Sequence, residues 1–92
     1  MPNQQIKLEW EKTAQKKFDT MIERIPLFHR EIAKTVAYKK AQLNAKERGS
    51  SIVEENDIVQ AFLSEVPKAF FSLMIRLFDE VGFNYKEFAS KH

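Results

Sequence analysis

The stretch MIERIPLFHR, residues 21–30, decides how the chain divides, because Pro26 separates two helical patterns within it. A proline lacks the backbone N–H that a helix interior needs, but it suits the first turn of a helix. One helix is therefore predicted to end near Ile25 and a second to begin near Pro26.

Before this junction, apolar residues recur at spacings of three and four. They are Trp10, Ala14, Phe18, Met21, Ile22 and Ile25. This spacing places them on one side of a helix. The opposite side carries Lys12, Gln15, Lys16, Asp19 and Glu23. The pattern predicts an amphipathic helix that packs against a neighbour.

After the junction, the pattern predicts a helix of about six turns that closes in Lys46-Glu47-Arg48-Gly49. Gly49 can adopt the left-handed C-cap conformation, and basic residues suit the end of the helix dipole. The predicted apolar face is broad and contains Phe28, Ile32, Val36, Leu43 and the alanines at 33, 37, 41 and 45. The small alanines would let a neighbouring helix approach closely.

The remaining chain predicts two further helices and a final turn. Residues 50–53 form an extended connection, and the acidic run Glu54 to Asp57 starts a third helix that is apolar on most sides and therefore central. Pro67 begins the next segment, which Gly82 ends. Asn84 and Glu87 have capping-box spacing, so a short last turn with Tyr85 and Phe88 is expected.

The fold class predicted is all-α, a small bundle of four to five helices with a long second helix. We expect one helical domain over residues 9–88, between a flexible N-terminus at 1–8 and a tail at 89–92.

Composition narrows the function classes. The 92 residues contain no cysteine and carry a formal net charge of +2. Disulfides, iron–sulfur ligation and thiolate zinc sites are therefore excluded. The N-terminal residues lack the apolar run of a signal peptide, and no apolar stretch approaches the length of a membrane span. We expect a cytoplasmic protein without a membrane partner.

Part of the sequence resembles a known family. The residues that carry the resemblance are Trp10, Ala14, Ile22 to Pro26, Phe28, Arg30, Ala45 to Gly49 and Val53 to Ala61. Together they resemble the small helical domain at the C-terminal end of the B subunit of light-independent protochlorophyllide reductase, over about residues 8–63. The resemblance implies an appended, accessory domain. It carries over no cluster ligand, because the chain has no cysteine.

The same stretch has a weaker likeness in outline to the histone fold. The long helix ending in glycine, the segment Ser51 to Val53 and the helix containing Asp57 and Ala61 resemble that arrangement. This likeness implies a DNA-binding dimer as an alternative function. Lys12, Lys16, Lys39 and Lys46 are then the candidate nucleic-acid or anion contacts. Acidic residues interspersed among them favour a solvated surface instead.

The segment after Pro67 has more large apolar residues than one helix pair requires. Phe70, Phe71, Met74, Leu77 and Phe78 either complete the core or form an exposed surface for a second copy or a larger protein.

Arg24 and Arg30 flank the Pro26 junction, where they could hold an anionic partner. The structural interpretation is favoured: Arg24 caps the first helix, and Arg30 pairs with a nearby carboxylate. Arg48 and Asp57 bracket the extended connection, and a pair between them would fasten the second helix to the third. His29 has neither a cysteine nor a second histidine nearby, so we predict a partly exposed side chain rather than a metal or acid–base group.

The sequence therefore predicts no catalytic, cofactor-binding or metal site. The favoured function is a non-catalytic accessory module that docks a protein partner or a second copy. The family resemblance implies an oxidoreductase of the protochlorophyllide reductase type as the associated enzyme. The alternative is the histone-like DNA-binding dimer.

Overall fold

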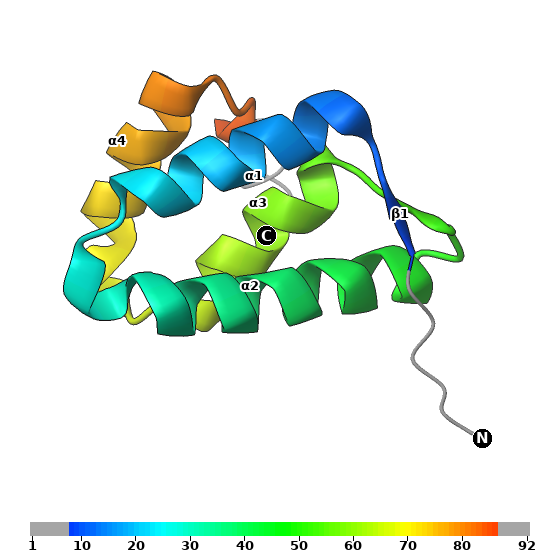
Figure 1. Ribbon diagram of the computed structural model, residues 1–92, viewed down its shortest axis with the longest axis horizontal. Helices are drawn as coiled ribbons and strands as arrows, with labels where there is room; N and C mark the ends of the chain where they lie inside the picture. The colour runs from blue at the N-terminus through cyan, green and yellow to red at the C-terminus, as the bar shows by residue number, and fades with distance from the viewer. Residues whose placement is uncertain (1–7, 87–92) are drawn as a thin grey trace.

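The computed structural model describes residues 8–86, which fold into helices around one core (Figure 1). In chain order the elements are β1 (Glu9–Trp10), α1 (Lys12–Arg24), α2 (Leu27–Glu47), β2 (Ile52–Val53), α3 (Glu55–Glu65), the 3-10 turn η1 (Lys68–Phe70) and α4 (Phe71–Val81). The predicted all-α class and the long second helix are confirmed. Glu87 and Phe88, assigned to the last turn, lie outside the described residues. None of the described helices is both long enough and apolar enough to cross a bilayer.

The junction between α1 and α2 lies at Pro26, as predicted. Ile25 and Pro26 have extended backbones, with ψ of 138° and 141°, and α2 begins at the next residue. α1 and α2 therefore run side by side in opposite directions (Figure 1). This hairpin supplies two of the walls that enclose the core.

The roles predicted for the two arginines at the junction are wrong, and the structure exchanges them. Arg30 caps α1: its Nη2 donates to the carbonyl oxygen of Glu23 at 2.7 Å, and its Nε donates to that of Ile25 at 3.2 Å. Arg24 instead forms an exposed ion pair with Glu80 of α4, at 3.0 Å. Arg24 points out from its own helix end, whereas Arg30 reaches back over it from the first turn of α2.

The closest helix packing is between α2 and α3. Ala37, Ala41 and Ala45 of α2 are buried, and they face a helix whose Ile58, Val59, Ala61 and Phe62 are also buried. α2 and α3 form the most extensive contact between elements of the described chain. The predicted close approach of a helix is confirmed at Ala37, Ala41 and Ala45 but not at the partly buried Ala33, and the central position predicted for the third helix is confirmed.

A short parallel pairing of β1 with β2 joins the N-terminal segment to the connection before α3. Glu9 pairs with Ile52 and Trp10 with Val53, and the N–H of Glu11 donates to the carbonyl of Val53 at 2.9 Å. Trp10 therefore lies in a strand and not on the helical stripe predicted for it. Its ring still reaches the core.

The Trp10 ring lies between the first two helices. It stacks on Tyr38 of α2 at a centroid distance of 4.8 Å and meets the edge of Phe18 of α1 at 5.1 Å. Its Nε1 donates to Oε1 of Gln42 at 3.2 Å. The indole thus satisfies its polar edge while its apolar body packs.

Two glycines end helices in the left-handed conformation. Gly49 follows α2 with φ of +81°, and Gly82 follows α4 with φ of +100°. The next residues fold back, so that the N–H of Ser50 donates to Ala45 and that of Phe83 donates to Phe78, both at 2.9 Å. The predicted glycine C-cap of the second helix is confirmed.

The side chains of Arg48 and Asp57 form the predicted clamp between α2 and α3. Nη2 and Nε of Arg48 donate to the two carboxylate oxygens of Asp57 at 2.7 and 3.1 Å. The hydrogen bonds to Asp57 raise the pKa of Arg48 above its ordinary value. Oδ2 of Asp57 also accepts the N–H of Glu54 at 2.8 Å, which completes a capping box at the start of α3.

Candidate functional site: an apolar groove

The N-terminal half of α2 exposes large apolar side chains. Phe28 is 93% exposed, Leu27 77% and Ile32 69%. The broad apolar face predicted for this helix is therefore divided: Ala37, Ala41 and Ala45 pack against α3, whereas Phe28 and Ile32 face solvent. Side chains of this size rarely remain in water without a function when they gather in one place.

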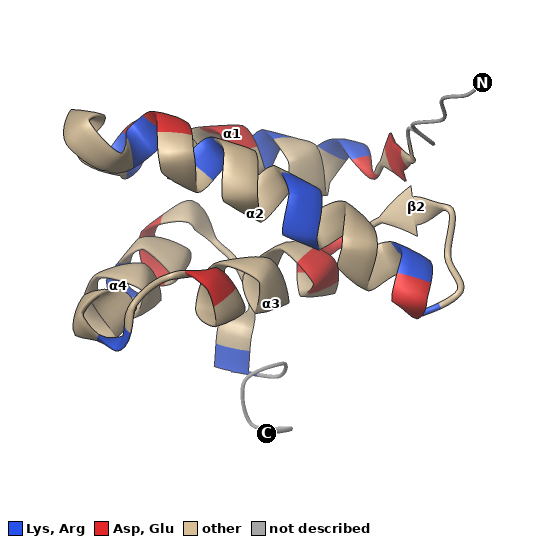
Figure 2. Cartoon of the chain, turned by 90° about the horizontal axis from the view of Figure 1, so that it is seen from below, with Lys and Arg blue, Asp and Glu red and all other residues tan. Residues whose placement is uncertain are grey.

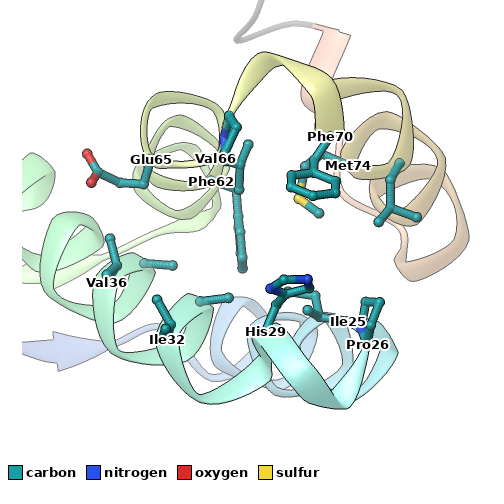
Figure 3. Close-up of a pocket in the computed structure, with 14 residues that line it drawn as sticks. Ile25, Pro26, His29, Ile32, Val36, Phe62, Glu65, Val66, Phe70 and Met74 are labelled. Carbon is teal, nitrogen blue, oxygen red and sulfur yellow. The ribbon is translucent and has the colours of Figure 1, made fainter.

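Ile32 borders an open apolar groove of about 330 Å³. One wall belongs to the start of α2 and consists of Pro26, His29, Ile32, Ala33, Val36 and Ala37. The opposite wall runs from the end of α3 into α4 and includes Phe62, Glu65, Val66, Pro67, Phe70 and Leu73. Figure 3 shows side chains of the two walls facing each other across the groove.

The groove exists because α3 is too short to cover α2. α2 has 21 residues and α3 has 11, which correspond to lengths of about 31 and 16 Å. Nδ2 of Asn44 donates to the carbonyl of Asp57 at 3.0 Å, so α3 starts beside the C-terminal end of α2. The N-terminal half of α2 is left beside the turn at Pro67 and the beginning of α4.

The large apolar residues after Pro67, for which a core role and a surface role were both open, are divided between the two. Met74, Leu77 and Phe78 are buried, because α4 turns them toward α1 and α3. These three residues therefore complete the core. Phe70 and Phe71 are exposed. Phe70 and the buried Met74 line the groove, and Phe71 does not.

His29 lies at the mouth of the groove among aromatic rings. Its ring centroid is 5.8 Å from that of Phe70 and 6.2 Å from that of Phe28. The side chain is exposed. Within residues 8–86 no three histidine or acidic residues are arranged to hold a metal ion. His29 and Glu65 are the titratable side chains of the lining, so the groove is built to accept apolar groups.

The four lysines predicted as anion contacts are all exposed and lie on two helices. Lys12 and Lys16 border a shallow depression on α1 together with Asp19. Lys39 and Lys46 lie in the second half of α2, and Figure 2 shows basic residues along the whole of this helix. Lys39 is one turn from Val36 in the groove wall, whereas the pair on α1 belongs to neither wall.

Sequence reasoning identified the apolar residues of α2 but missed the groove between α2 and the Pro67 turn. The available signal was the difference between the two predicted helix lengths, with Pro67 marking the end of the shorter helix. No protein-family model, curated protein or solved structure matches this chain significantly.

Proposed function

We propose that this chain is a protein-interaction module and that the groove between α2 and the α3–α4 connection is its docking site. The observation that carries the proposal is the cavity of about 330 Å³ bordered by the exposed Ile32. A cavity of about 150 Å³ holds a benzene molecule, so the groove has room for about two large apolar side chains of a partner.

The lining supports docking of side chains better than binding of a polar substrate. Twelve of its fourteen residues are apolar, and they include Phe62, Val66 and Leu73. Apolar burial is the main source of free energy in protein association, at about 25 cal/mol per Å². Interfaces concentrate this burial in a few pockets that receive aromatic or aliphatic side chains.

The resemblance of residues 8–63 to the protochlorophyllide reductase domain supports an accessory role and suggests which partner to test first. An oxidoreductase of that type is the first candidate. The groove wall beyond residue 63, including Val66 and Phe70, lies outside the resembling segment. The partner specificity would therefore come in part from the chain's own C-terminal third.

Affinity capture with matched variants tests the proposal. The immobilised wild-type chain, the variant Ile32→Glu and the variant Leu27→Glu are each exposed to extract of the source cells. Both substitutions place a charge on an exposed apolar position of α2, but only Ile32 lines the groove. Substitutions at such exposed sites change stability by about 0.5 kcal/mol or less, and circular dichroism verifies that both variants fold.

A partner that is retained by the wild type and by Leu27→Glu, and lost from Ile32→Glu, is the expected result. The substitution Ala33→Phe, which fills the groove from its own wall, should abolish capture in the same way. Identical sets of captured proteins on all four chains would refute the groove as the docking site.

A further inference from the structure

The groove has lysines around an apolar centre. Lys39 and Lys40 follow Val36 by three and four residues, which places them one turn beyond the lining on the surface of α2. Lys68, in η1, directly follows Pro67 of the opposite wall. Each wall therefore has a lysine next to it, and the second wall also contains Glu65.

These lysines form no ion pair among the described residues. The ion pairs found within residues 8–86 involve Lys17, Arg24 and Arg48, and none involves Lys39, Lys40 or Lys68. Glu65 is the acidic residue of the lining. Its carboxylate points away from the cavity in Figure 3. Three lysines, Lys39, Lys40 and Lys68, therefore lie beside the groove walls, together with the outward carboxylate of Glu65.

We propose that the groove binds an acidic amphipathic helix from another protein. Apolar side chains at helical spacing would fill the cavity between Val36 and Val66. Aspartate or glutamate residues on the flanks of that helix would meet Lys39, Lys40 and Lys68. This inference rests on the proposed docking function and adds the chemistry of the partner to it.

Charge and shape favour this occupant over two others. A second copy docked through the same face would bring two sets of lysines together, and like charges across an interface oppose association. An anionic membrane would satisfy the lysines, but a bilayer surface offers no protruding side chain to occupy a concave site. A helix with acidic flanks and apolar side chains can pair with the lysines and fill the cavity at the same time.

Two matched peptides test the inference by fluorescence anisotropy. One is a labelled, side-chain-stapled helix with leucines at i, i+3, i+4 and i+7 and glutamates on both flanks. The other has the same leucines, with lysines in place of the glutamates. The acidic peptide should bind on the order of tenfold more tightly at low salt, and high salt should reduce the difference because it screens exposed charges.

Variants of the full chain locate the effect. The double variant Lys39→Gln/Lys40→Gln should lose most of the preference for the acidic peptide. The control Lys12→Gln/Lys16→Gln removes the same charge from exposed positions of α1, outside the groove walls, and should keep the preference. Ile32→Glu should weaken binding of the acidic peptide at both salt concentrations.

The contrary outcomes separate the two proposals. Equal binding of both peptides, abolished by Ile32→Glu, would overturn the acidic partner while supporting the docking groove. Absence of binding by either peptide would overturn this inference, and the capture experiment would decide the docking function separately. Binding to phosphatidylserine vesicles that blocks the acidic peptide, or a dimer in light scattering that Ile32→Glu dissociates, would replace the helix with a membrane or a second copy.

Discussion

Asp57, only 2% exposed, meets Arg48 through two hydrogen bonds, of 2.7 and 3.1 Å, although Arg48 itself is 35% exposed. Asp57 lies in the first turn of α3 and Arg48 directly follows α2, so the pair joins the end of one helix to the start of the next. Because of this unequal exposure, removal of Arg48 leaves a buried carboxylate, whereas removal of Asp57 leaves a guanidinium that solvent can reach.

Arg48→Met is expected to destabilise the fold by about 3–5 kcal/mol, because it leaves a buried carboxylate without its counter-charge. Asp57→Asn should cost less, about 1–2 kcal/mol, because the amide oxygen can still accept the N–H of Glu54. Urea unfolding followed by circular dichroism measures both values. Equal losses of unfolding free energy in the two variants would contradict the expectation that Arg48→Met is the more destabilising change.

Glu11 caps α1, and this cap should depend on pH. Its carboxylate accepts the N–H of Ala14 at 2.8 Å, and this backbone hydrogen bond lowers the pKa of Glu11 below its ordinary value. A pKa lowered by folding adds stability above the unfolded pKa, and the gain is lost as the pH falls through the folded value. The stability difference between wild type and Glu11→Ala should therefore shrink below about pH 4. A difference that stays constant to about pH 2 would show that the carboxylate charge is irrelevant.

Gly49→Ala should destabilise the chain by about 1 kcal/mol, because the backbone at φ of +81° disfavours a side chain. Apart from Gly49 and its chain neighbours, no atom of the described residues lies within 4 Å of the position that the new Cβ would take, so the cost is conformational. Gly49→Asn should cost less, since asparagine tolerates this conformation better. Thermal unfolding of the two variants checks the order, and a larger loss for asparagine would contradict it.

Ala41 and Ala33 lie two turns apart on α2 and should respond differently to enlargement. Ala41 is fully buried in the contact with α3, so Ala41→Leu should cost about 1–3 kcal/mol through overpacking. Ala33 lines the groove, and Ala33→Leu should leave stability nearly unchanged because the new side chain enters open space. Denaturant midpoints compare the two. Equal destabilisation would mean that the groove is closed in solution.

The helix boundaries are predictable from sequence because the residues that set them act locally. Pro26 and Gly49 act through their own backbone conformations, which favour a helix start and a helix end. The Arg48–Asp57 pair follows from the short connection between its partners. The β1–β2 pairing is not predictable in this way, because Trp10 also fits the helical periodicity of α1. Its strand conformation depends on hydrogen bonds to a segment about 40 residues away.

The groove also depends on contacts between residues that are far apart in the sequence. The sequence shows that α2 is apolar on a broad face, but the uncovered part of that face depends on where α3 starts along α2. Phe28 and Val36 cannot be distinguished by periodicity, although one is almost fully exposed and the other lies in a groove wall. The burial of Met74 and Phe78 depends likewise on α4 turning toward α1.

Intermolecular nuclear Overhauser effects between methyl-labelled protein and the acidic stapled peptide test the central claim most directly. The account predicts contacts from the peptide leucines to the methyl groups of Ile32, Val36 and Leu73, which line the groove. It predicts none to the exposed methyl groups of Leu27 and Ile52, which lie outside it. Contacts confined to Leu27 or Ile52, or a bound peptide without contact to the groove, would contradict the claim.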